Sequence, residues 1–174
     1  HSYLNAVTCP KITETHALHA GVRALASDMP DVASAMLSTA CRIHPAAWRL
    51  HVMFGQALLA AGRPGRAKTV AAHAGDDTSA ACIQARAEID LARPACALRK
   101  LSEHPEAGPR RADVLALKAV AYRLCGRLVE AKAAYEGLFG EGYDGPRHRM
   151  GYAVVLGRLG LGRSALGVLD ELVG

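Results

Sequence analysis

Alanine recurs through this chain at a nearly fixed interval, and this periodicity constrains the fold more than any other feature. The intervals are 34, 30, 34 and 34 residues, between Ala33, Ala67, Ala97, Ala131 and Ala165. Self-similarity with a period of roughly 20–50 residues is typical of proteins that stack copies of one supersecondary unit. The sequence therefore predicts a repeat protein with about five units.

Each alanine is preceded, five residues earlier, by a position where a helix is expected to end. These positions hold Asp28, Gly62, Ala92, Gly126 and Gly160. Glycine adopts the left-handed conformation that ends helices, which explains three of the five. Three residues before the first three alanines stand Pro30, Pro64 and Pro94, and proline suits the first turn of a helix. Each alanine thus lies near the start of a second helix.

The first helix of each unit also carries a signature. Twelve residues before the alanines, every residue is small: Gly21, Gly55, Ala85, Ala119 and Ala153. A small side chain at a fixed place lets a neighbouring helix approach closely. Four residues after the alanines, one turn along the same face, come Leu37, Ala71, Leu101, Tyr135 and Leu169. The pattern predicts paired helices packed in a constant register.

Ten helices follow from these signals. We expect them over 14–27 and 30–43, 46–61 and 64–74, 78–92 and 94–104, 110–125 and 128–139, and 146–159 and 163–173. The shorter interval has a local cause, because Gly75–Asp76–Asp77–Thr78 ends one helix early and caps the next, removing about one turn. Residues 1–13 show no clear repeat and are expected to form a lead-in.

Composition agrees with an all-α chain. Hydrophobic residues make up 51%, largely alanine, leucine and valine, whereas aromatic residues are only 5%. No apolar run reaches membrane-spanning length. The formal net charge of +5 favours acidic partners at long range. The five cysteines share no CxxC spacing, four of them are expected to behave as small buried hydrophobes, and a reducing, cytoplasmic location is favoured. The chain begins at His1, so it does not exclude an original signal peptide.

The pattern resembles the tetratricopeptide repeat (TPR) family, whose helix–turn–helix unit has a small residue in its first helix and an alanine in its second. The units are about 14–47, 48–77, 78–111, 112–145 and 146–174. The fourth fits best, through Ala119, Tyr122, Gly126, Ala131 and Tyr135. The third departs most, with Glu88 at a usually apolar place and Ala92 replacing glycine, which leaves open a shifted or irregular helix pair.

The resemblance implies a right-handed α-α superhelix whose first helices line a concave groove. Such proteins are generally non-enzymatic adaptors or chaperones that hold a peptide or helix of a partner protein. The family's groove positions fall on Thr15, Leu18, Val22, Leu25, Arg49, Val52, Gln56, Leu59, Ser79, Cys82, Arg86, Ile89, Asp113, Ala116, Val120, Arg123, Arg147, Met150, Val154 and Arg158. This surface is apolar toward its N-terminal end and rich in arginine toward its C-terminal end.

These residues favour an apolar partner segment that carries acidic residues. Arginine engages a carboxylate through two parallel hydrogen bonds, while an aliphatic wall accepts apolar anchors. The alternative is that the arginines only solvate an exposed helical face. The lysine and asparagine clamp of the family's chaperone-tail subset is absent, because the corresponding places hold Leu18, Val22, Met53, Ser79 and Ile83.

Other patterns predict no chemistry. His16 and His19 lie one turn apart without a third ligand, so neither a metal nor a cofactor is expected. The segment from Gly62 to Thr69 lacks the glycine spacing and the preceding strand of a phosphate loop. No serine or cysteine has a nucleophile signature, and we expect no enzyme. Trp48 is expected to pack between the first two units.

The last helix is apolar along one face, through Leu166, Val168, Leu169, Leu172 and Val173. Terminal repeats normally present a polar outer face. We therefore expect this face to be covered by a partner, by a second copy through self-association, or by further chain.

The preferred function is a bacterial-type TPR scaffold that binds another protein. The units around Gly126 and Gly160 are similar to those of repeat proteins in secretion and pilus-assembly machines. One alternative is a nucleic-acid-binding helical repeat, because Arg110, Arg111 and the run Arg147–His148–Arg149 carry positive charge that phosphates attract. A second alternative is a sensor segment of a larger regulator.

Overall fold

The computed structural model describes residues 12–75, 77–104 and 108–173, with their side chains except that of Val173, and these residues form ten helices without a strand. The helices are α1 (Glu14–Ala26), α2 (Pro30–Ile43), α3 (Trp48–Ala60), α4 (Pro64–Ala72), α5 (Thr78–Asp90), α6 (Pro94–Ser102), α7 (Arg111–Leu124), α8 (Leu128–Gly140), α9 (Pro146–Arg158) and α10 (Gly162–Val173). The predicted helices are confirmed, each within two residues. None of the described helices is long and apolar enough to cross a membrane.

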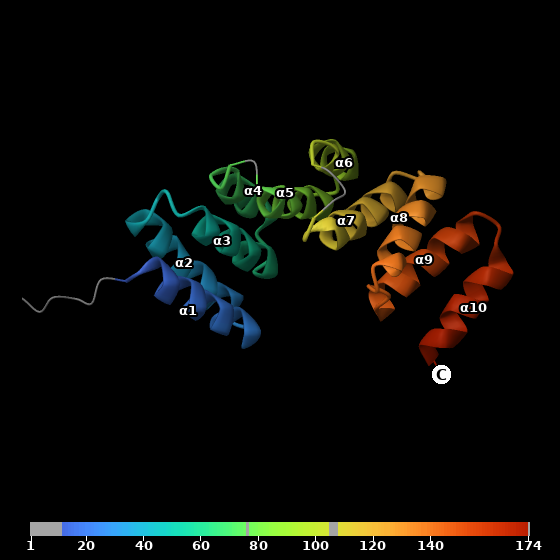
Figure 1. The fold of residues 1–174 in the computed structure, drawn as a ribbon, viewed down its shortest axis with the longest axis horizontal. Helices are drawn as coiled ribbons and strands as arrows, with labels where there is room; N and C mark the ends of the chain where they lie inside the picture. Colours follow the sequence, from blue (N-terminus) through green and yellow to red (C-terminus); the bar gives the residue numbers. More distant parts are fainter. Residues whose placement is uncertain (1–11, 76, 105–107, 174) are drawn as a thin grey trace, which may run out of the picture.

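The helices form five successive hairpins that follow one another along the long axis of the molecule (Figure 1). The backbones of successive odd-numbered helices approach one another, from α1 and α3 through to α7 and α9. No two even-numbered helices do so within the described residues. The odd-numbered helices therefore form one continuous layer, and the even-numbered helices form a second, outer layer.

Every predicted helix stop has a left-handed backbone. Gly62, Gly126 and Gly160 have φ values of 69°, 74° and 79°. The two stops that lack glycine adopt the same conformation, with φ 54° at Asp28 and 60° at Ala92. A non-glycine residue in this region costs roughly 1–2 kcal/mol. The register of the hairpins thus overrides the local preference of these two residues.

The small residues of the first helices are where neighbouring helices come closest. A Cβ atom on Gly21 would lie 2.7 Å from the Met53 sulfur and 3.1 Å from the Leu37 methyl groups. On Gly55 it would lie 3.0 Å from Cγ2 of Ile83. The prediction of close approach is confirmed, because no larger side chain fits at these places without moving its neighbours.

The junction between α4 and α5 accounts for the 30-residue interval. Helix α4 ends at Ala72 after nine residues. Asp77 then caps α5, its carboxylate accepting a hydrogen bond of 2.8 Å from the Ser79 N–H. An aspartate at this position satisfies a backbone donor that has no partner within the helix. Asp76, which belonged to the predicted cap, lies outside the described residues.

The third unit is regular, so the option of a shifted helix pair is wrong. Helices α5 and α6 pack as a hairpin in register with their neighbours. Glu88 occupies the usually apolar position and is only 7% exposed. Its Oε1 forms an ion pair with Nζ of Lys68 in the preceding unit, at 2.5 Å, while its buried Oε2 has no protein partner. A partner from another hairpin thus makes a charge tolerable in this core.

Two side-chain predictions are wrong. Trp48 does not pack as a buried anchor, because it is the first residue of α3 and stays 43% exposed, with the Arg49 guanidinium 5.4 Å from its ring centroid. Cys125 is exposed rather than buried, because α7 ends at the preceding residue. Both residues lie at helix ends, where a neighbouring unit does not cover them.

Candidate partner-binding groove

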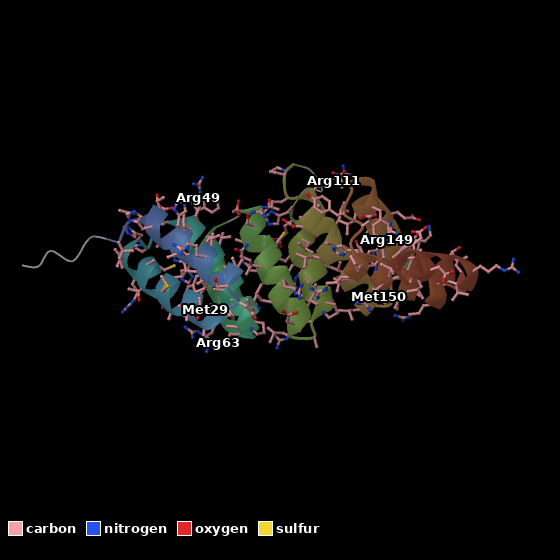
Figure 2. The ribbon with its side chains drawn as sticks, turned by 90° about the horizontal axis from the view of Figure 1, so that it is seen from below. Met29, Arg49, Arg63, Arg111, Arg149 and Met150 are labelled. Carbon is pink, nitrogen blue, oxygen red and sulfur yellow. The ribbon has the colours of Figure 1, made fainter. Side chains whose placement is uncertain are left out.

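A cavity of about 410 Å³ lies on the odd-numbered layer between α5, α7 and α9. Its lining combines basic and apolar side chains: Arg86, Ile89, Asp90, Leu117, Val120, Arg123, Tyr135, Arg147, His148, Met150, Gly151 and Val154. Apart from Tyr135, which comes from α8, all of these residues belong to the three odd-numbered helices. Met150 is labelled among them in Figure 2.

A second cavity of about 440 Å³ continues this surface toward the N-terminus. Its lining residues are Gln56, Leu59, Ser79, Cys82, Ile83, Arg86, Arg110, Asp113, Ala116, Leu117 and His148. The two cavities share Arg86, Leu117 and His148. We call the surface formed by both cavities the groove, and it runs from α3 to α9.

The C-terminal part of the groove has an excess of positive charge. Arg86 is neutralised by Asp90, at 3.1 Å. Within the described residues, neither Arg123 nor Arg147 forms an ion pair, and Nε of Arg123 is buried without an acceptor. Arginine is always charged, so these two guanidinium groups favour an anionic group in the groove.

The wall of this cavity depends on a close contact between α8 and α9. Tyr135 is 1% exposed, and its hydroxyl lies directly against the backbone of Gly151. A Cβ atom on Gly151 would lie 2.9 Å from Cζ of Tyr135. Phe139 stacks on the same ring and Tyr152 packs against it at a tilt, with centroids 6.3 and 6.1 Å away. Glycine at 151 is therefore what lets the tyrosine reach the cavity.

The titratable groups of the groove show no activated nucleophile. Burial, with a smaller contribution from the negative charge of Asp113, raises the pKa of the Cys82 thiol to about 11. A thiol with this pKa stays protonated at neutral pH, whereas the thiolate is the reactive form. His16 and His19, the pair considered as metal ligands, are both exposed on α1, away from these cavities. The groove is suited to binding rather than to thiol chemistry.

The structure brings seven of the predicted partner-binding residues together in the first cavity. They are Arg86, Ile89, Val120, Arg123, Arg147, Met150 and Val154. Gln56 and Leu59 join Arg86 in the second cavity. Because these side chains come from four different helices, their shared surface is a property of the stacked fold.

Four further groove positions, Ser79, Cys82, Asp113 and Ala116, also line the second cavity, and the remaining predicted residues lie outside both cavities. Val52 is 8% exposed and belongs to the hydrophobic core cluster of the first hairpins, so its placement in the groove is wrong. Leu18 and Leu25 are half-buried against the same core. Val22, Arg49 and Arg158 are exposed, and Arg158 donates a hydrogen bond of 3.3 Å to the Arg123 carbonyl.

Several lining residues were not predicted. Asp90 follows Arg86 by one helical turn, so the helical period alone places both on one face. His148 stands inside the basic run at the start of α9, where only its charge had been considered. Tyr135 and Gly151 had no signal as groove residues, because their contact joins two helices of different units.

The apolar face of α10 is only partly covered. Leu166 is 62% exposed, whereas Val168, Leu169 and Leu172 are half-buried. Within the described residues, α10 contacts only α9. The prediction that another surface covers this face stays a prediction.

No family model and no curated protein sequence matches this chain. Solved structures do match it. A thermophilic TPR protein from Thermus thermophilus has a TM-score of 0.77 at 19% identity, over 91% of this chain and 89% of that one. The fold is a TPR-like solenoid. MamA from Desulfovibrio magneticus RS-1 has the same arrangement, with a TM-score of 0.74 at 17% identity, over 91% of this chain and 92% of that one. In this TPR-like fold the groove lies on the layer formed by the first helix of each pair.

Proposed function

We propose that this TPR-like chain is a scaffold that binds a segment of a partner protein in the groove. One observation carries the proposal: two guanidinium groups without an acid partner, Arg123 and Arg147, line a cavity whose remaining wall is largely apolar. An open, continuous surface across four helices suits an extended or helical segment better than a small molecule.

The chemistry of the lining defines the partner segment. Apolar side chains of the segment would contact Ile89, Val120 and Val154. An acidic residue near them would pair with Arg123 or Arg147, since guanidinium and carboxylate groups form two parallel hydrogen bonds. The match of the fold to solved TPR structures supports a role in protein interaction in general.

The nucleic-acid alternative has less support, because three of its four arginines, all except Arg147, already have acid partners. Arg110 pairs with Asp113 at 3.0 Å, and Arg111 with Glu141 at 2.9 Å. Arg149 is held by two acids, Asp144 and Glu171. Arginine binds nucleic acid by displacing the counterions condensed on its phosphates, and for these arginines the ion pairs within the protein would first have to break.

Binding is tested with short labelled peptides that combine leucine with glutamate, measured by fluorescence anisotropy. We expect binding that weakens at least about tenfold in the double variant Arg123→Glu, Arg147→Glu, since the groove then repels the acidic segment. Arg163→Glu on α10 is the control, because Arg163 is exposed and lies outside both cavities. A peptide of the same composition with lysine in place of glutamate should not bind.

Capture from a native lysate then identifies the partner. A protein retained by the wild type and by Arg163→Glu, but lost with the groove variant, supports the proposal. Equal loss in both variants would mean that only net charge matters. Binding to generic RNA or DNA that falls steeply with salt would favour the nucleic-acid alternative.

Narrower predictions stay predictions. A place in a bacterial secretion or pilus-assembly machine, a cytoplasmic location, the absence of catalysis and the sensor alternative all require the captured partner and the full gene. The same capture experiment addresses them, because the identity of the partner defines the machine.

A further inference from the structure

Helix α2 exposes a stripe of large apolar side chains on its outer face. Met29, at the cap of the helix, is 46% exposed, Val32 48%, Met36 44% and Ile43 51%. Their spacings of three, four and seven residues place them along one side of an α-helix. The residues that face the core, such as Leu37, are fully buried on the other side. We call these four residues the α2 stripe.

The stripe does not follow from the repeat. The position of Met29 is occupied by an arginine in the next three outer helices, at Arg63, Arg93 and Arg127. The position of Val32 is occupied by Arg66, Cys96 and Glu130. Figure 2 shows Met29 and Arg63 along the same edge of the molecule. Only the last helix, α10, has an apolar residue at the Met29 position, Leu161. At these two positions the outer helices in the middle of the solenoid are mostly charged, whereas α2 is apolar.

The charges beside the stripe are arranged so that two copies of α2 complement each other. Asp28 is exposed at the N-terminal end of the helix, and Arg42 is exposed at its C-terminal end. Asp31 lies about a third of a turn around the helix from the stripe and pairs with Arg63 of the next hairpin at 2.9 Å, so it takes no part in this arrangement. In an antiparallel pair, the acidic end of one helix faces the basic end of the other.

We propose that the α2 stripe binds the α2 helix of a second copy of this chain, antiparallel and around a two-fold axis near Met36. Met29 and Ile43 lie seven residues on either side of Met36. Met29 of one copy therefore meets Ile43 of the other copy across this axis. Asp28 and Arg42 are centred on position 35, one residue from the same point. A surface that pairs with itself in this way gives a closed dimer rather than an open chain of copies.

The interface is small, since it is one helix of 14 residues per copy. It therefore forms a weak, concentration-dependent dimer. Its place on the outer layer leaves both grooves accessible, so the dimer presents two binding sites to a partner. Two linked sites bind a repetitive or membrane-attached partner more tightly than either site alone. The proposal does not depend on the function of the groove.

Sedimentation velocity over a range of concentrations tests the dimer. We expect the wild type to shift from 18.3 kDa toward twice this mass. Met36→Glu should weaken association at least about tenfold, because two carboxylates would face each other at the axis. Val129→Glu is the matched control, since Val129 is 70% exposed on α8 and lies outside the stripe. Thermal unfolding of both variants verifies that they fold.

Three results would overturn the proposal. One is a wild type that stays monomeric at all concentrations, with the stripe open or covered by another part of the chain. Another is a dimer that survives Met36→Glu but is lost with Leu166→Glu, which would place the contact on α10. The third concerns Met36→Cys: under mild oxidation it should form a disulfide between copies more rapidly than Val129→Cys, and an equal rate would contradict the two-fold axis.

Discussion

Two junctions between successive hairpins, α6 with α7 and α8 with α9, fill the space between their helices with different side chains. Where α6 meets α7, Leu101 is fully buried, and Leu117 packs against its cluster from the next unit. Where α8 meets α9, the equivalent positions hold Tyr135 and Gly151. The larger residue in α8 is matched by the absence of a side chain in α9.

The comparison shows that these two junctions fill a similar volume with different residue types. A core accepts exchanged side chains when total volume and pattern are kept. At the junction between α8 and α9 this exchange also shapes the groove, because Tyr135 passes over Gly151 and becomes part of the groove wall. The difference thus decides where the cavity lies along the molecule.

Truncating the large residue should have the largest effect. We expect Tyr135→Ala to lower the free energy of unfolding by about 3–5 kcal/mol, since it removes a buried aromatic ring and leaves a cavity. Leu101→Ala should cost about 2–4 kcal/mol for the same reason. Urea denaturation measures both. An equal or larger loss in Leu101→Ala would contradict the view that Tyr135 alone fills its junction.

Adding volume on the other side of the contact should come next. Gly151→Ala is expected to cost about 1–3 kcal/mol, because its Cβ would collide with Tyr135. The control is Gly157→Ala on the same helix, where a Cβ meets nothing within 4 Å. This change should stabilise by up to about 1 kcal/mol through helix propensity. In a Tyr135→Leu background the cost of Gly151→Ala should largely disappear.

The position nine residues before the repeat alanine differs between the third and the fourth unit. It holds the buried Glu88 in α5 and the half-buried Tyr122 in α7. Lys68→Met should cost about 1–2 kcal/mol, because it leaves the Glu88 carboxylate without its partner. Adding Glu88→Leu should return stability to the wild-type level or above, since a buried ion pair is often no better than an apolar pair. Thermal unfolding of the three variants would detect a double variant that stays destabilised.

Substitutions at the helix stops of the third and fourth units should change the free energy of unfolding in opposite directions. Gly126→Ala is expected to cost about 1 kcal/mol, because φ is 74° there and alanine is strained in that region. Ala92→Gly should stabilise by up to about 1 kcal/mol, since φ is already 60°. Chemical denaturation of both variants should give changes of opposite sign.

The smallest effect concerns pH at the α8–α9 junction. Burial, with a hydrogen bond of 2.9 Å to Glu136, raises the pKa of Tyr152 to about 12, from a usual value of 10. The folded state therefore holds the proton more tightly, and stability should fall as pH rises from about 10 to about 12. Tyr152→Phe should show a shallower fall over this window. Identical pH curves would mean that this phenol contributes nothing to the pH dependence.

Local backbone features could be predicted because they depend on residues close in sequence. The stops at Gly62 and Gly126, the proline at the first turn of α4 and the cap at Asp77 each act on their own hairpin. The groove was predicted in part, since helical spacing places Arg86 and Ile89 on one face of α5.

The sequence by itself determined ten helices, their pairing into five hairpins and the small residues at which they touch, because helix period, caps and left-handed stops are encoded locally. Only the tertiary structure decided that Val52 lies in the core, that Lys68 neutralises Glu88, and that Tyr135 lines the cavity beside Gly151. The physical reason is that the surroundings of these side chains come from the neighbouring hairpin. How one hairpin rotates onto the next is set by the combined volumes at each junction, which no single segment of the chain encodes.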